Sequence, residues 1–173
     1  TGRRLILSNG YHGWASDLLN VPPAWGIPDP PPPASKRSVA GHARERGRLI
    51  RTIPFNDLGA VENACYGLDP DPDYANGEDS TIHADYTAAI MIEPETREAP
   101  KPGYLAGLRK WCDKYGMLLI ADEAITNGRY PEWSAMHHYG TYADLYVFAK
   151  GLANGWPLAC VVGRRELMRC YDV

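Results

Sequence analysis

The sequence predicts an α/β fold built on a mostly parallel sheet. Short apolar runs bounded by turn residues, which indicate buried strands, alternate along the chain with segments of helical periodicity. The apolar runs are nearly continuous and do not alternate with polar residues, a pattern typical of parallel strands whose two faces are both covered. We therefore expect a three-layer α/β/α arrangement with helices on both sides of the sheet.

Six apolar runs are the expected strands: residues 5–7, 49–53, 88–92, 117–121, 145–149 and 158–162. Pro54 stops the second run, because proline has no amide hydrogen for a strand ladder. The third run ends at Glu93-Pro94 and the fourth leads into Asp122-Glu123. Lys150 follows the fifth run and opens a glycine-rich turn.

Three segments are expected to be helical. Residues 103–115 carry apolar side chains at i, i+3, i+4 and i+7, with Gly116 placed as a C-cap. Residues 57–66 are expected to form a second helix with Asn56 as its N-cap, and a third begins at Glu166. Two polar segments, 21–48 and 69–85, are rich in proline or glycine and are expected to be surface insertions that act as lids, interface arms or mobile loops.

Composition excludes several classes of function. The chain has 173 residues and a formal net charge of −3, and no basic block interleaves with aromatic residues, so we expect no nucleic-acid partner. Four cysteines lie far apart without the spacing of a zinc site or a disulfide framework, so we expect no metal site and free thiols in the cytoplasm. No apolar run approaches the roughly 18 residues of a membrane span. The first residue is not Met and the last ones interrupt a predicted helix, so a piece of a longer polypeptide is expected.

Reactive side chains follow several of the predicted strands. An amine that leaves an apolar strand, as at Lys150, is expected to be desolvated and to be a good nucleophile toward a carbonyl. Asp122 follows a neighbouring run, and ligands collect at the carboxyl ends of parallel strands. Pyridoxal phosphate needs a lysine for its aldehyde, a carboxylate for its pyridine nitrogen and an aromatic ring to stack on. Lys150, Asp122 and Tyr11 meet these needs.

These residues resemble the motifs of the class III pyridoxal-phosphate aminotransferases of fold type I, in the branch of glutamate-1-semialdehyde aminomutase. The resemblance rests on four segments and runs from about Leu5 to the last residue: Tyr11–Trp14, Ile92–Pro94, Leu119–Thr126 and Ala149–Arg164. It implies a transferase or isomerase that moves an amino group between a small-molecule donor and a carbonyl acceptor. It also implies a homodimer.

The resemblance assigns roles to individual residues. Lys150 would form the Schiff base with the cofactor and then move a proton on the substrate. Asp122 would pair with the pyridinium nitrogen. A surface lysine and a turn cap are the structural alternatives at these two positions. Neither alternative requires a cofactor.

Four further residues are predicted to bind the cofactor. Tyr11 would stack on its ring, unless it is a buried core tyrosine, while His12 and Gly13 shape the turn. Glu93 would lie near the cofactor or substrate, although a simple strand-end residue is almost as good an interpretation. Glu123 is expected to point to the opposite side of the strand from Asp122 and to make structural hydrogen bonds.

The resemblance also indicates which part of the protein this sequence represents. Residues 1–173 would be the central part of the large domain, and the family's phosphate-binding turn and C-terminal small domain are not in the sequence. Where the family usually has Gly-Phe-Arg, this chain has Asn127-Gly128-Arg129. The alternative is a non-catalytic remnant or an interaction module that keeps the fold and not the activity.

Overall fold

The computed structural model describes residues 2–3, 5–13, 50–66 and 87–169. The chain divides into two compact units, residues 1–89 and 90–173. Within the described ranges, six strands follow the order β2-β1-β3-β4-β5-β6 in one sheet, and β3 (Thr87–Ile92) crosses the boundary between the units. The predicted insertions at 21–48 and 69–85 lie outside the described residues.

The first unit contains two parallel strands and a helix. β1 (Leu5–Asn9) pairs with β2 (Ile50–Thr52), and α2 spans Leu58–Tyr66. Leu7, Ile53 and Val61 are fully buried or nearly so and form the centre of this unit's core. The helix prediction is confirmed, but its cap is corrected: the side chain of Asp57 accepts the amide hydrogen of Ala60, at 2.9 Å. Asn56 instead has a positive φ of 62°, which does not suit the extended backbone of an N-cap.

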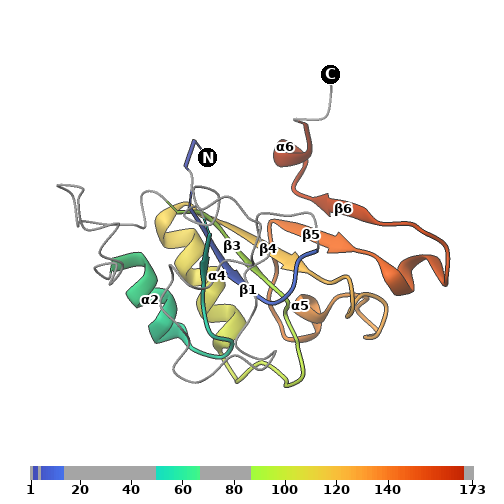
Figure 1. The fold of residues 1–173 in the computed structure, drawn as a ribbon, viewed down its shortest axis with the longest axis horizontal. Coiled ribbons are helices and arrows are strands. Elements are labelled where there is room, and N and C mark those ends of the chain that lie inside the picture. The colour runs from blue at the N-terminus through green and yellow to red at the C-terminus, as the bar shows by residue number, and fades with distance from the viewer. Residues whose placement is uncertain (1, 4, 14–49, 67–86, 170–173) are drawn as a thin grey trace, which may run out of the picture. The chain divides into compact units, whose positions relative to one another are not determined.

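The second unit holds the elements that follow β3. After α4 (Tyr104–Tyr115) come β4 (Leu118–Asp122), α5 (Ala135–His138), β5 (Leu145–Phe148), the 3-10 turn η3 (Lys150–Ala153), β6 (Cys160–Gly163) and α6 (Arg165–Met168). β4 and β5 are parallel, whereas β6 returns antiparallel to β5. Figure 1 shows β4, β5 and β6 as neighbouring arrows.

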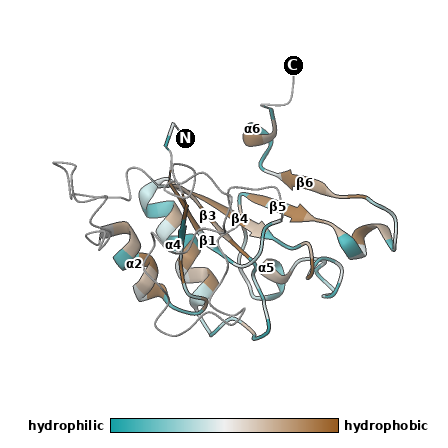
Figure 2. Ribbon diagram, viewed as in Figure 1, coloured by the Kyte–Doolittle hydropathy of each residue, from teal (hydrophilic) through white to brown (hydrophobic). Residues whose placement is uncertain are grey.

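Helix α4 confirms the predicted amphipathic segment almost residue for residue. Its apolar face is buried, including Tyr104, Leu105, Leu108 and Cys112, while the rest of the helix carries charged residues (Figure 2). Gly116 ends it in the left-handed conformation, with φ 62°, and its amide donates to the carbonyl of Cys112. Glycine adopts this conformation without the steric cost of a Cβ.

Two elements near the end of the chain have other bounds in the structure than the sequence predicted. The strand expected at 158–162 begins only at Cys160 and ends at Gly163, and Leu158 is exposed. The helix expected from Glu166 starts one residue earlier. None of the helices in the described part of the chain has the length and hydropathy of a transmembrane helix.

Candidate functional site

The structure places Asp122 and Lys150 at neighbouring ends of two parallel strands. Asp122 is the last residue of β4 and lies opposite Val147 of β5. The ladder continues one step further, because the amide of Glu123 donates to the carbonyl of Val147 at 2.9 Å. Lys150 comes three residues after Val147, in the turn that follows β5. The predicted carboxylate and amine are therefore carried on adjacent strand ends of the second unit.

Lys150 has an unusual backbone conformation. Its φ is 47°, in the left-handed region that side chains other than glycine seldom adopt. Ala149 before it is extended, and the amide of Leu152 donates to the Ala149 carbonyl at 3.0 Å, which closes the turn. Such a conformation costs on the order of 1 kcal/mol or more and persists where neighbouring contacts fix it.

The expectation that Lys150 is desolvated is wrong for the described structure. Lys150 is exposed, and so are most of the residues of the turn that carries it. The reason is local: β5 presents only half-buried side chains near its end, and η3 contributes no buried residue. The amine is therefore accessible from solvent.

Asp122 is held more tightly than Lys150. It is 8% exposed, and its Oδ1 accepts the amide hydrogen of Ala124 at 3.1 Å. This short contact within the turn fixes the carboxyl group close to its own backbone. Its position at a strand end fits a carboxylate that meets a ligand at the carboxyl edge of the sheet.

Glu123 makes the structural hydrogen bonds that the sequence predicted. It is fully buried, and its carboxylate accepts from the Ser134 hydroxyl at 2.6 Å and from the amides of Ala135 and Met136 at 2.8 and 3.1 Å. Amides at the start of a helix have no partner within the helix, so the Glu123 carboxylate caps α5 by accepting from them. Thr126 adds a weaker contact at 3.3 Å.

Glu93 directly follows β3 and is half-buried. The carboxylate two residues later was missed by sequence reasoning. Glu95 accepts hydrogen bonds from the hydroxyls of Tyr130 and Tyr139, the latter at 2.8 Å. Tyr130 also stacks on His138, with ring centroids 4.2 Å apart. The loop after β3 is thereby joined to the segment around α5, and no spacing in the sequence signals these contacts.

The three predicted cofactor residues of the first unit follow β1. The ring Nε2 of His12 donates to the carbonyl of Asn9 at 2.9 Å, which folds the chain back at the strand end. Gly13 has φ 109°, a conformation that requires glycine. Tyr11 is half-buried. Their grouping with Asp122 and Lys150, which belong to the second unit, stays a prediction.

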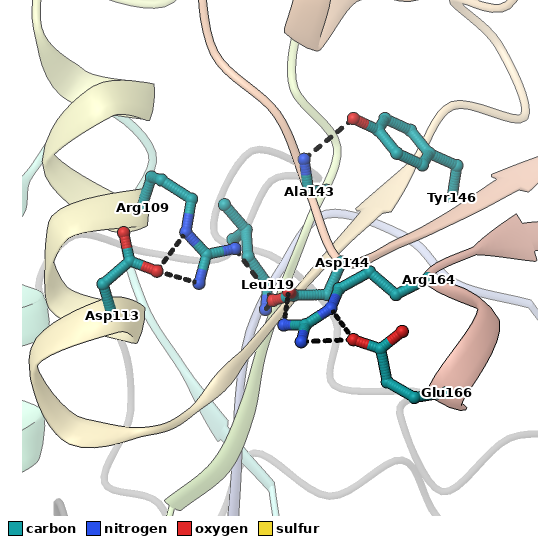
Figure 3. Close-up of polar contacts among 8 residues, drawn as sticks. All are labelled: Arg109, Asp113, Leu119, Ala143, Asp144, Tyr146, Arg164 and Glu166. Carbon is teal, nitrogen blue, oxygen red and sulfur yellow. Dashed lines mark hydrogen bonds and ion pairs between the residues drawn. The ribbon is translucent and has the colours of Figure 1, made fainter. Parts of the chain in front are cut away.

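Another buried carboxylate, that of Asp144, fixes the start of β5 (Figure 3). Asp144 is 1% exposed and accepts from Arg109 Nη1 at 2.8 Å, from the Leu119 amide at 2.8 Å and from Arg164 Nη1 at 3.0 Å. Burial alone would raise the pKa of Asp144, but the Leu119 amide and the two guanidinium groups outweigh it and hold that pKa below its usual range. The network ties α4, β4 and the end of β6 to the strand that leads to Lys150.

The two adjacent histidines, His137 and His138, contact different partners. His137 contacts the Tyr146 hydroxyl at 3.1 Å, and His138 contacts Glu132 at 3.3 Å. Among the residues that the structure describes, no group of three or more histidine, cysteine or acidic side chains is arranged to hold a metal ion.

Comparison with known proteins shows the family to which the sequence is related. The family model "Aminotransferase class-III" matches residues 77–173. The chain is 35% identical, over 97% of its own length, to the glutamate-1-semialdehyde 2,1-aminomutase of Myxococcus xanthus, and it covers 36% of that protein.

Solved structures show the same fold. A transaminase with PLP bound matches 98% of the chain with a TM-score of 0.70 and 25% identity, and the chain covers 36% of it. An omega-transaminase from Sphaerobacter thermophilus matches 99% of the chain with a TM-score of 0.73 and 25% identity, and the chain covers 37% of it. The predicted α/β fold of type I is confirmed, and the chain spans little more than a third of the length of these relatives.

Proposed function

Because the chain belongs to the class-III aminotransferase family, we propose that it carries the reactive part of a pyridoxal-phosphate enzyme that transfers an amino group. One observation supports this most: β4 and β5 bring Asp122 and Lys150 to adjacent ends of parallel strands. The cofactor is the one bound in a transaminase of the same fold. The substrates would be a small-molecule amine donor and a carbonyl acceptor.

The side chains present fit this cofactor. When bound, pyridoxal phosphate supplies an aldehyde that condenses with a lysine amine and a protonated ring that accepts electrons. Lys150 offers an amine that solvent and ligands reach, on a turn whose backbone is fixed. Asp122 offers a mostly buried carboxylate at the next strand end. An amine and a carboxylate held on separate strands suit a ring that must be contacted at two places.

In the proposed mechanism Lys150 and Asp122 have different tasks. Lys150 would hold the cofactor covalently through its amine and, once freed by the donor amine, would act as the base that moves a proton between the substrate Cα and the cofactor C4′. The Asp122 carboxylate would keep a proton on the ring nitrogen, because a negative charge beside that nitrogen favours its protonated form.

The remaining assignments belong to the same proposal. Tyr11 would stack on the ring, His12 and Gly13 would shape the turn beneath it, and Glu93 would support the cofactor or substrate from the end of β3. The chain would be the central part of a large domain, within a homodimer in the cytoplasm. The proposal leaves open whether the amino group returns to the same molecule, as in an aminomutase, or moves to another.

The experiment uses the complete gene product that contains this chain. The protein is loaded with pyridoxal phosphate and mixed with an amine donor, and conversion of the cofactor to its amine form is followed by absorbance and chromatography. Wild type should convert it, Lys150→Ala should not, and Asp122→Asn should lose at least about a hundredfold in rate, as general acid–base and electrostatic terms of this kind do. Equal conversion by wild type and Lys150→Ala would overturn the proposal, and no conversion by wild type would favour the non-catalytic alternative.

A further inference from the structure

Asn127 links the two strand ends that carry the proposed reactive side chains. It lies in the segment after β4 and is 4% exposed. Its side-chain Nδ2 donates to two carbonyl oxygens, that of Glu123 at 2.6 Å and that of Ala149 at 3.0 Å. The first carbonyl comes one residue after Asp122 and the second one residue before Lys150. A single buried amide thus spans the gap between the ends of β4 and β5.

The chemistry of these contacts selects an asparagine side chain. Both partners are carbonyl oxygens, which only accept hydrogen bonds, so a group with two donors is required between them. The amide oxygen of Asn127 is buried and has no hydrogen-bond partner among the described residues. A buried acceptor without a partner costs free energy. The side chain of Asn127 therefore makes its two donated hydrogen bonds while its own amide oxygen stays unpaired.

The contact with Ala149 bears directly on the conformation of Lys150. The carbonyl of Ala149 and the nitrogen of Lys150 belong to one planar peptide group, so fixing that carbonyl fixes one side of the Lys150 φ angle. Two donors hold it: the Leu152 amide at 3.0 Å and Asn127 Nδ2. The main chain also packs closely here, since a Cβ on Gly151 would lie 3.7 Å from the Asn127 carbonyl oxygen. The left-handed φ of Lys150 is therefore clamped from outside the turn.

We propose that Asn127 is a positioning residue that sets the place and direction of the Lys150 side chain relative to Asp122. Its use in catalysis rests on the function proposed above, whereas the clamp itself is a property of the chain alone. Asn127 touches neither reacting group and acts only through the peptide groups beside them. Loss of the amide donors should let the Ala149–Lys150 peptide rotate, and the amine should then sample more than one direction.

The test separates the clamp from the chemistry. Asn127→Asp keeps the shape but places a carboxylate against two carbonyls, and Asn127→Ala removes the side chain. Ser134→Ala is the matched control, because it removes a buried hydrogen bond to Glu123 in the same segment without reaching β5. In the cofactor-free gene product, amide hydrogen exchange at Leu152 should speed up by roughly tenfold in both Asn127 variants, as expected for one lost hydrogen bond. Ser134→Ala should exchange there like wild type.

With pyridoxal phosphate added, the pH dependence of the Lys150-linked absorbance band should shift in both Asn127 variants and not in Ser134→Ala. Wild-type exchange at Leu152 in Asn127→Ala would overturn the proposal, as would an unchanged pH profile. Should Asn127→Asp not fold, Asn127→Ala decides alone. If wild type forms no Lys150 adduct with the cofactor, the function proposed above fails. Hydrogen exchange at Leu152 in the cofactor-free protein still shows whether Asn127 holds the turn in place.

Discussion

Replacing Asp144 by asparagine should destabilise the protein by about 3 kcal/mol, because removing one member of a buried ion pair leaves an uncompensated charge. Asp144 and Arg109 have side chains 2% and 8% exposed, and their atoms lie 2.8 Å apart. The asparagine amide would add a donor where two guanidinium groups and an amide already donate. Asp113 still contacts Arg109 at 2.7 Å, which keeps the loss at the lower end of the range for buried pairs.

The second partner of Asp144 contributes much less. The Arg164 side chain is 53% exposed, and pairs with an exposed member are worth less than about 1 kcal/mol. Arg164→Gln is therefore the control. Urea unfolding measures the loss in unfolding free energy of each variant, provided that the dependence of that free energy on urea concentration is the same in both. Equal losses in Asp144→Asn and Arg164→Gln, or a loss below about 1 kcal/mol in Asp144→Asn, would refute the assignment of the energy to the buried pair.

The same carboxylate predicts a pH dependence. The folded pKa of Asp144 lies below its unfolded value near 3.8, so its contribution to stability is present above that value. The contribution is lost as pH falls below 3.8 and through the lower folded pKa. The wild type should lose stability there more steeply than Asp144→Asn, and parallel pH profiles of the two proteins would contradict this sign.

Two further predictions concern packing and thiols. Gly163→Ala should cost about 2 kcal/mol or more in urea unfolding, because its Cβ would overlap the Asp144 carbonyl oxygen and lie 2.7 Å from Leu145 Cδ2; an unchanged midpoint would refute it. Burial, opposed by a nearby arginine, raises the pKa of Cys65 to about 11, so at pH 8 a thiol reagent should label the half-buried Cys160 well before Cys65. Mass spectrometry measures both rates, and equal rates in the folded protein would contradict the burial of Cys65.

Local patterns in the sequence were enough to predict most of the fold. The helix at 103–115 and its Gly116 cap were found because apolar spacing and a left-handed glycine are local signals. The cap of α2 was predicted one residue too early, since both Asn56 and Asp57 suit that role chemically and only the backbone distinguishes them. The start of β6 was also predicted too early, because pairing with β5 decides where that strand begins.

The places of Asp122 and Lys150 in the sheet could be predicted from the sequence, whereas their surroundings could not. Asp122 and Lys150 lie on adjacent strand ends as expected, because strands that follow one another in the chain usually lie next to each other in a sheet. The exposure of Lys150 was not foreseen, because apolar neighbours in sequence do not guarantee cover in space. Asn127 and Asp144 act through partners 22 and 35 residues away, and such contacts leave no periodic trace in the sequence.

Lys150 is the residue that we propose to bind pyridoxal phosphate. The most direct measurement is reduction of the cofactor-loaded gene product with borohydride, followed by peptide mapping by mass spectrometry. We predict one modified lysine, Lys150, in wild type, the same adduct in Lys110→Ala, whose lysine is exposed on α4, and no adduct in Lys150→Ala. A modified lysine elsewhere, or labelling that persists at the same level in Lys150→Ala, would mean that Lys150 does not bind the cofactor.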